Sequence, residues 1–108
     1  AYRHTGAMIS LHRDDGGAIN RNPAAVEAFG PVSAPAAPGD LADQLGGADR
    51  VRQARQALAV SGRYTERVPV ATRQGARWLD VSLRRVPDPA DGGDLLLFDA
   101  QDATEAQH

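Results

Sequence analysis

The fold is decided by three neighbouring segments that read RYTERVPVAT (63–72), RWLDVSLRRV (77–86) and DLLLFDA (94–100). In the middle segment Leu79, Val81 and Leu83 alternate with Trp, Asp, Ser and Arg, which is the period of two that is typical of a half-buried antiparallel strand. The connections at 73–76 and 87–93 contain the Gly and Pro residues of turns. The sequence therefore predicts a three-stranded antiparallel meander, one face of which must be covered by other elements.

The chain before the meander is predicted to begin with a hairpin. Residues 7–12 are expected to form a strand and residues 18–21 the returning strand. Asp14-Asp15-Gly16-Gly17 supplies the residues that tolerate the positive backbone angles of the tight turn between them.

A first helix is predicted directly after this hairpin. Asn22 can accept hydrogen bonds from the first free N–H groups, Pro23 suits the first helical position, and Gly30 can end the helix. Val26 and Phe29 are three positions apart, so we expect both side chains to face the core.

Two further helices are predicted after a loop. Residues 31–39 are rich in Pro, Ala and Ser, which disfavour both helix and strand, and we expect a mobile loop there. Asp40 is expected to cap a helical turn over 41–45, and a longer helix should run from Asp49 to about Val60. Its buried stripe is predicted to consist of Val51, Ala54 and Leu58.

Length and composition limit the possible functions. The 108 residues fit one domain. The net charge is only −2 and no basic run carries aromatic residues, so nucleic acid is not an expected partner. The chain has no cysteine and no membrane-length apolar run, which fits a cytoplasmic protein. Because the sequence starts without Met or a signal peptide, we expect a piece excised from a longer protein.

The order of the predicted elements indicates an α+β domain with one antiparallel sheet and helices over one face. Over about residues 5–105 the sequence resembles the PAS domain family. Four segments in the same order carry the resemblance, namely Asp15-Gly16, Asn22-Pro23-Ala24-Ala25 leading to Phe29-Gly30, Arg73-Gln74-Gly75-Ala76-Arg77-Trp78, and Asp102-Ala103-Thr104-Glu105. The family more often has a β-branched residue where this chain has Ala103, which predicts looser packing at the end of the last strand.

The resemblance implies a five-stranded antiparallel sheet of order 2-1-5-4-3, with a pocket between its inner face and the helices. It also implies a sensory and dimerisation module, most simply a homodimer, within a larger signalling protein. In bacterial relatives the Asp-x-Thr motif passes the last strand to a helix that enters an output domain, such as a histidine kinase of a two-component system or a diguanylate cyclase. Residues 105–108 would then form the first turn of that helix.

The residues expected to face this pocket are apolar, so they could equally form a filled core or surround a ligand. They are Ile9, Leu11, Val26, Phe29, Leu45, Val51, Leu58, Val68, Val70, Leu79, Val81 and Leu83. Haem is not expected because no histidine lies on the predicted helices, and a cysteinyl flavin is not expected because there is no cysteine. A redox flavin or another small organic ligand remains open.

The sequence predicts neither a metal site nor a catalytic site. The histidines, His4, His12 and His108, lack metal-ligand spacing, and His12 is expected to be a hydrogen-bonded or half-exposed strand residue. The aspartates near 14, 88–94 and 99–102 are explained by turn chemistry. The alternative is a small α+β enzyme such as an isomerase, which would need a paired carboxylate and imidazole in a polar pocket.

Two regions are predicted to connect the domain to its partners. Trp78 should lie on the outer sheet face and contact a second chain or a flanking helix; alternatively it lies over an arginine stem such as that of Arg67. Asp102 and Thr104 are expected to cap the outgoing helix. Arg73 and Arg77 could reach Asp102 and form a signal-relay latch.

Overall fold

The computed structural model describes residues 6–107 and contains the elements in the predicted order. They are β1 (Met8–Arg13), β2 (Ala18–Arg21), α1 (Pro23–Phe29), α2 (Gly39–Leu45), α3 (Ala48–Ser61), β3 (Arg63–Thr72), β4 (Gly75–Pro87), β5 (Asp94–Asp102) and α4 (Thr104–Gln107). The turn between β3 and β4 is shorter than predicted, because Thr72 still pairs with Gly75. The Thr72 hydroxyl stabilises this turn by accepting from the Gln74 N–H and donating to the Gly75 carbonyl.

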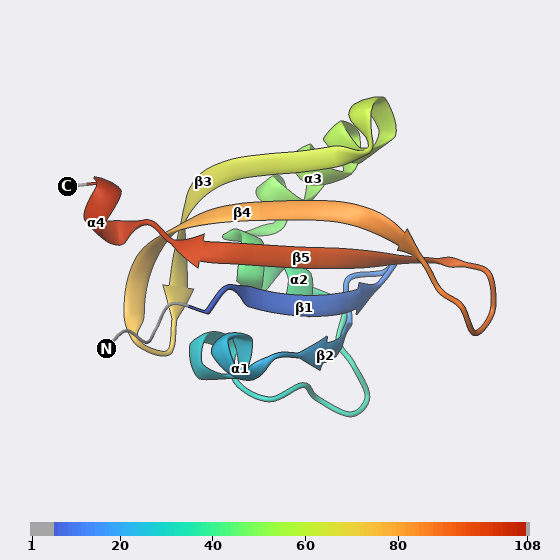
Figure 1. The fold of residues 1–108 in the computed structure, drawn as a ribbon, viewed down its shortest axis with the longest axis horizontal. Helices are drawn as coiled ribbons and strands as arrows, with labels where there is room; N and C mark the ends of the chain where they lie inside the picture. The colour runs from blue at the N-terminus through green and yellow to red at the C-terminus, as the bar shows by residue number, and fades with distance from the viewer. Residues whose placement is uncertain (1–5, 108) are drawn as a thin grey trace.

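The five strands form one antiparallel sheet with the order β2-β1-β5-β4-β3, as the resemblance implied. Figure 1 shows α2 and α3 behind the sheet and α1 beside β1 and β2. Strand β3 is an edge strand, and it contains Pro69. An edge is the position where a missing N–H is tolerated.

The core lies between the sheet and the helices α2 and α3. The predicted alternation on β4 is confirmed, since Leu79, Val81 and Leu83 are buried and the residues between them are not. Register places Leu83 opposite Phe98 of β5, and Phe98 is also fully buried. The largest apolar side chains of the two central strands therefore meet on one face.

The prediction for β1 was wrong by one position. Met8, Ser10 and His12 face the core, whereas Ile9 is 41% exposed and Leu11 is half-buried on the opposite face. Pairing decides this, because Ser10 lies opposite the inward-facing Phe98 of β5. A shift of one residue moves every side chain of a strand to the other face, and hydropathy alone favoured the row with Ile and Leu.

Helix α1 is capped as predicted but buries different residues. The Asn22 side chain accepts from the Ala25 N–H and from the Ile9 N–H of β1, and it donates to the Ala7 carbonyl just before that strand. Ala25 and Ala28 are buried, and Phe29 packs against the core. Val26 is only half-buried, so the expectation that Val26 faces the core was wrong. Asn22 holds α1 against β1, which turns the Ala face inward.

Helix α2 is fastened to the first hairpin at its start. Asp40 lies inside the helix and not at its cap position, which is Pro38. Its carboxylate accepts from the Ala37 N–H at 3.1 Å and from the Ala18 N–H of β2 at 2.8 Å. The predicted cap is therefore a clamp that joins two elements. Helix α3 buries Ala54 and Leu58 with Val51 half-buried, as predicted.

We predict that Gly16→Ala destabilises the protein more than Gly75→Ala. Both glycines have φ of 103°, so both variants should carry a similar backbone strain of about 1–2 kcal/mol. Only at Gly16 would the new Cβ lie 2.5 Å from the Pro38 carbonyl oxygen, whereas at Gly75 it meets no described atom within 4 Å. Urea unfolding should show an additional loss of about 1–3 kcal/mol for Gly16→Ala. Equal losses would show that the hairpin turn does not press on the start of α2.

Candidate functional site

The inner face of the sheet is a packed core. Leu45, Val68 and Leu83 are 0% exposed, so no water-sized space touches their side chains. Most of the residues expected to line a pocket belong to this packed cluster, namely Phe29, Leu45, Val51, Leu58, Val68, Val70, Leu79, Val81 and Leu83. Val26 is half-buried outside the cluster, and Ile9 and Leu11 are on the outer face. These side chains contribute packing to the fold.

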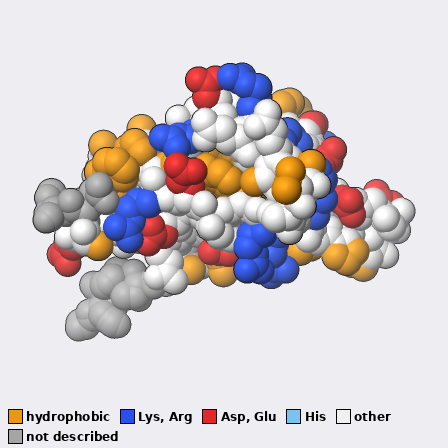
Figure 2. All heavy atoms as spheres, turned by 90° about the horizontal axis from the view of Figure 1, so that it is seen from above, with side chains coloured by type: hydrophobic (Ala, Val, Ile, Leu, Met, Phe, Trp, Pro, Cys, Tyr) orange, Lys and Arg blue, Asp and Glu red, His pale blue; other side chains and the backbone are white. Residues whose placement is uncertain are grey.

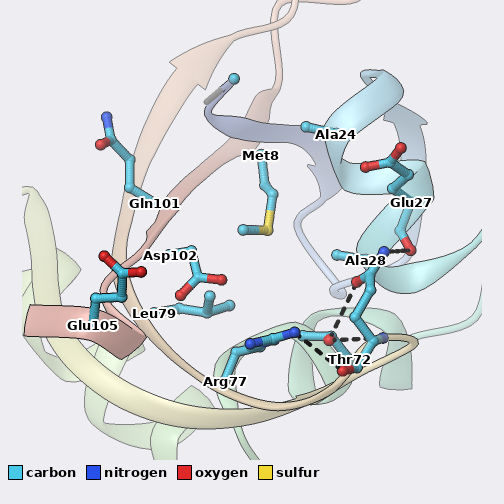
Figure 3. Close-up of a pocket in the computed structure, with 12 residues that line it drawn as sticks. Met8, Ala24, Glu27, Ala28, Thr72, Arg77, Leu79, Gln101, Asp102 and Glu105 are labelled. Atoms are coloured by element: carbon cyan, nitrogen blue, oxygen red, sulfur yellow. Dashed lines mark hydrogen bonds between the residues drawn. The ribbon is translucent and has the colours of Figure 1, made fainter. Parts of the chain in front are cut away.

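A groove of about 700 Å³ lies at one end of this core, between α1, the β3–β4 turn and the start of α4. Figure 3 shows Met8, Ala28 and Leu79 at its apolar base, with Glu27 and Arg77 among the polar side chains around it. Of the predicted pocket residues only Leu79 lines it. Sequence reasoning missed this groove because its walls come from segments that are far apart in the chain.

Carboxylates are the commonest charged groups of the groove. Glu27, Asp102 and Glu105 line it together with a single arginine, Arg77. Burial raises the pKa of Asp102, but the hydrogen bonds from Thr104 and the charge of Arg77 outweigh this effect, so the pKa lies below its ordinary value. The groove is therefore negatively charged around an apolar base at neutral pH.

A second feature is a chain of buried polar side chains that crosses the inner face of β1. His12 Nδ1 lies 2.8 Å from the Gly16 carbonyl oxygen, and His12 Nε2 lies 2.8 Å from Ser10 Oγ. Gln44 Nε2 of α2 donates to Ser10 Oγ at 2.9 Å, and Arg21 Nε of β2 donates to Gln44 Oε1 at 3.0 Å. We call Ser10, His12 and Gln44 the buried polar network. It ties the first two strands to α2.

The network fixes the protonation state of His12. A carbonyl oxygen can only accept, so Nδ1 carries the hydrogen and donates it to Gly16. Nε2 then accepts from the Ser10 hydroxyl, which in turn accepts from Gln44. Burial lowers the pKa of His12, and this favours the same neutral form. His12 is hydrogen-bonded, as predicted, but it is 0% exposed and not half-exposed.

The contact between Ser10 and His12 has the geometry of a nucleophile and its base. However, Ser10 is 2% exposed and His12 0% exposed, so a substrate cannot reach either group in this structure. His12 is also oriented by a carbonyl and not by a carboxylate, unlike the pair that an isomerase would need. Within residues 6–107 no group of three His, Cys, Asp or Glu side chains could hold a metal ion. His4 and His108 lie outside those residues.

The Asp-x-Thr segment joins β5, β4 and α4. The Asp102 carboxylate accepts from the Thr104 N–H at 2.9 Å, and Thr104 Oγ1 accepts from the Trp78 N–H at 3.0 Å. The Ala103 N–H donates to the Trp78 carbonyl at 2.7 Å, and Ala103 is buried despite its small side chain. The sheet therefore continues through this segment to the first residue of α4.

The predicted latch between Asp102 and the two arginines does not form as an ion pair. Neither Arg73 nor Arg77 lies within 4.0 Å of the Asp102 carboxylate in the described part of the chain. The Arg73 N–H donates to the Ala28 carbonyl, and the Arg77 guanidinium donates to the Gln74 carbonyl at 3.4 Å. The junction is instead held by Thr104 and by backbone bonds, with Arg77 acting on Asp102 through its charge.

The outer sheet face carries a half-exposed apolar strip. Register places Leu11 opposite Leu97 and Val86 opposite Leu95 across three neighbouring strands, and all four are half-buried. Ile9 extends the strip on β1. We call Ile9, Leu11, Val86, Leu95 and Leu97 the outer apolar strip. Apolar area of this kind is a common feature of contact surfaces.

Trp78 lies on β4, also directed away from the core, and is half-buried. The Arg67 guanidinium is held by Asp80 through bonds of 2.7 and 3.1 Å. Within residues 6–107 the Arg67 guanidinium makes no cation–aromatic contact with Trp78, and packing of its stem on the indole stays an alternative prediction. Its contact with a second chain stays a prediction.

Charged side chains of both signs are interspersed along the edge formed by β3 and α3, as Figure 2 shows. Arg50 pairs with Glu66 at 3.0 Å, which joins α3 to β3. This face has no extended basic patch of the kind that binds nucleic acid. None of the helices within residues 6–107 combines the length and the apolar character that a membrane span requires.

We predict that Thr104→Val loosens the end of the sheet and that Thr104→Ser does not. Valine keeps the shape of the side chain but removes the acceptor of the Trp78 N–H, which should cost about 1 kcal/mol of unfolding free energy. The Trp78 amide should exchange faster with solvent in NMR, and the fluorescence of this single tryptophan should shift. If the Val and Ser variants behave alike, the hydroxyl does not hold the junction.

Solved structures with the same arrangement are known. The PAS domain of a protein from Colwellia psychrerythraea matches with a TM-score of 0.71 and 16% sequence identity, over 92% of this chain and 87% of that one. An RNA-binding light-oxygen-voltage receptor matches with a TM-score of 0.67 and 20% identity, over 96% of this chain but only 31% of the receptor. No family model and no curated protein matches the sequence. At these identities the likeness concerns the fold.

Proposed function

We propose that this chain, which has the PAS fold, is a signal-input and dimerisation module of a longer signalling protein. The observation that carries the proposal is the junction at Ala103 and Thr104, where α4 begins while its first residues are still bonded to Trp78 of β4. A movement of the sheet therefore moves the first turn of α4. Small displacements of packed elements are a common means of signal transfer.

The output domain is proposed to follow α4. A histidine kinase or a diguanylate cyclase in a bacterial cytoplasm would receive the signal through a continuous helix. The helical start at Thr104–Gln107 with Glu105 in its first turn supports an outgoing helix. The lack of cysteine is compatible with a reducing compartment.

The stimulus is proposed to be a small organic ligand, which includes a redox flavin, or a protein partner. The groove in Figure 3 is the better place for a small ligand than the core, because Leu45 and Leu83 leave no space around them. Asp102 lines the groove and also caps α4, so an occupant that bonds to Asp102 would act directly on the junction.

A ligand-free interaction module is the second candidate function. The packing of the inner face favours it, because Leu83, Leu96 and Phe98 are all 0% exposed. In this case a partner or a second copy would supply the signal, and the junction at α4 would act in the same way.

We predict that Asp102→Ala and Thr104→Val leave the domain folded but lock or uncouple the output of the full-length protein. Both changes remove a bond at an exposed or half-exposed junction, which should cost only about 0.5–1.5 kcal/mol of stability. Thr104→Ser is the matched control and should switch normally. Output activity is measured with and without stimulus. Normal switching in both variants would show that this segment is only a linker, and a loss of folding would show that its role is structural.

Homodimerisation is proposed to use the outer sheet face. The outer apolar strip and Trp78 lie on this face, and Ile9 and Leu11 sit there because of the register between β1 and β5. A second copy of the chain could cover the strip by presenting the same residues, as two-fold interfaces do. Aromatic residues such as Trp78 commonly anchor interfaces of this kind.

We predict that Ile9→Asp and Trp78→Ala weaken this dimer at least about tenfold, since burying an unpaired charge or losing an aromatic anchor costs more than about 1.4 kcal/mol. Val60→Asp is the control, because Val60 is 88% exposed on α3, away from the sheet. Analytical ultracentrifugation of the protein with its natural linkers gives the dissociation constants. Wild-type association in both sheet variants would place the dimer contact elsewhere.

A further inference from the structure

The buried polar network is the only bridge of side-chain hydrogen bonds between α2 and β1 in residues 6–107. Gln44 reaches Ser10 on β1 and receives a bond from Arg21 on β2. Arg21 also donates to the Gly30 carbonyl at 2.9 Å, where the loop before α2 begins. The network therefore holds α2 and the end of α1 to the same two strands.

Each member of the network has a complete set of partners only while His12 is neutral. The Ser10 hydroxyl then donates to His12 and accepts from Gln44. Every buried side-chain N or O atom in the described residues has a hydrogen-bond partner. A fully satisfied network of this kind is rigid and specific.

A second proton on His12 removes this arrangement. His12 Nε2 would become a donor to Ser10 Oγ, which already accepts from Gln44, so the hydroxyl hydrogen of Ser10 would have no acceptor. Gln44 could offer its oxygen to Ser10 only by turning its amide, which would direct an NH₂ group at Arg21. In the first case the bond from Gln44 is kept but the Ser10 hydroxyl is left unsatisfied, and in the second case the bond from Arg21 is lost. In both cases one buried polar group of the network lacks a partner, which costs about 1–3 kcal/mol.

The charges around His12 do not compensate for the added proton. Arg21 of β2 opposes a positive charge on His12, and Asp40 of α2 favours it. Strand β5 contributes no charge there, because it presents the Phe98 ring in a T-shaped contact at 6.3 Å. Desolvation is the largest effect and lowers the pKa of His12 below its ordinary value.

We propose that the buried polar network is a proton-operated lock, in which protonation of His12 favours the local opening of α2 away from β1 and β2 while the rest of the sheet stays folded. The freed segment would be α2 together with the loop over residues 31–38 that leads into it. Helix α2 also places Leu41 and Leu45 in the apolar core, and Asp40 accepts from the Ala18 N–H, so the open form is a minor population that protonation of His12 increases. The rest of the core is held by apolar packing between β3, β4, β5 and α3, which does not titrate. The lock is a property of the fold, and it holds or fails independently of the role of α4.

The sign of the pH effect follows from linkage. The released form has a histidine with an ordinary pKa of about 6.5, whereas the pKa in the locked form is lower. The released form therefore binds the proton more tightly, and acidification through pH 6.5 favours it. The opening equilibrium should therefore increase between pH 7.5 and pH 5.5, by at most about tenfold, which is the limit that the ordinary pKa of the released histidine sets. The stabilising effect of neutral His12 is fully present above pH 6.5.

Hydrogen exchange tests the lock, with rates corrected for the intrinsic effect of pH. In the wild-type chain, amides of 41–45 should open up to about tenfold more at pH 5.5 than at pH 7.5. Amides of 50–58 in α3 serve as the internal reference and should change little. If α2 and α3 open in parallel, or if α2 does not respond while NMR shows His12 becoming protonated, the proposal is wrong.

Two variants separate the lock from general acid sensitivity. His12→Gln cannot titrate, so the opening of α2 in this variant should not depend on pH over this range. A pH response as large as that of the wild-type chain would overturn the proposal.

Gln44→Leu keeps the size of the side chain but removes the bonds to Ser10 and Arg21. In this variant His12 should still titrate, whereas α2 should open more often at pH 7.5 than in the wild-type chain and should respond less to pH. A remaining tenfold response would show that Gln44 is not the connection.

Discussion

The structure depends on one constraint, which is that the polar side chains on the inner face of β1 must find hydrogen-bond partners inside the core. Register with β5 directs Ser10 and His12 inward, where an unsatisfied hydroxyl or imidazole would be costly. Gln44 meets this requirement from α2, and the carbonyl of Gly16 meets it from the hairpin turn. The same two residues therefore contribute both to the position of α2 and to the shape of the turn.

This buried network differs in strength from the ion pairs on the surface. Arg67 and Asp80, and likewise Arg50 and Glu66, are exposed or nearly so, and pairs of this kind contribute about 0–1 kcal/mol each. Groups of the network are buried and have no water to replace a lost partner. The surface pairs therefore adjust easily, whereas the network has one satisfied arrangement.

Much of the fold could be predicted from the sequence because local signals agreed. The strict alternation on β4 indicated a strand, and the glycines at 30 and 62 indicated where helices end. Neither signal needed any tertiary information. On β1 the local signals failed, since Met8 and Ile9 are both apolar and each could begin the inward row. Only the register with β5 distinguishes the two rows, and register is a contact between distant segments.

The site was harder to predict for the same reason. Ser10 and Gln44 are 34 residues apart, and neither residue type suggests a core position. The groove likewise combines α1, the β3–β4 turn and the start of α4. Asp102 and Thr104 were chosen from their local motif as predicted relay residues. The motif could not show that Thr104 binds the Trp78 backbone and that neither Arg73 nor Arg77 forms an ion pair with Asp102 in the described residues. Strand β5 connects the two regions, because it pairs with β1 opposite His12 and continues to Asp102. Strand β5 is bonded to a strand on each side along this length, so the pairing that sets the inward row of β1 also fixes the position of the residue from which the chain turns into α4.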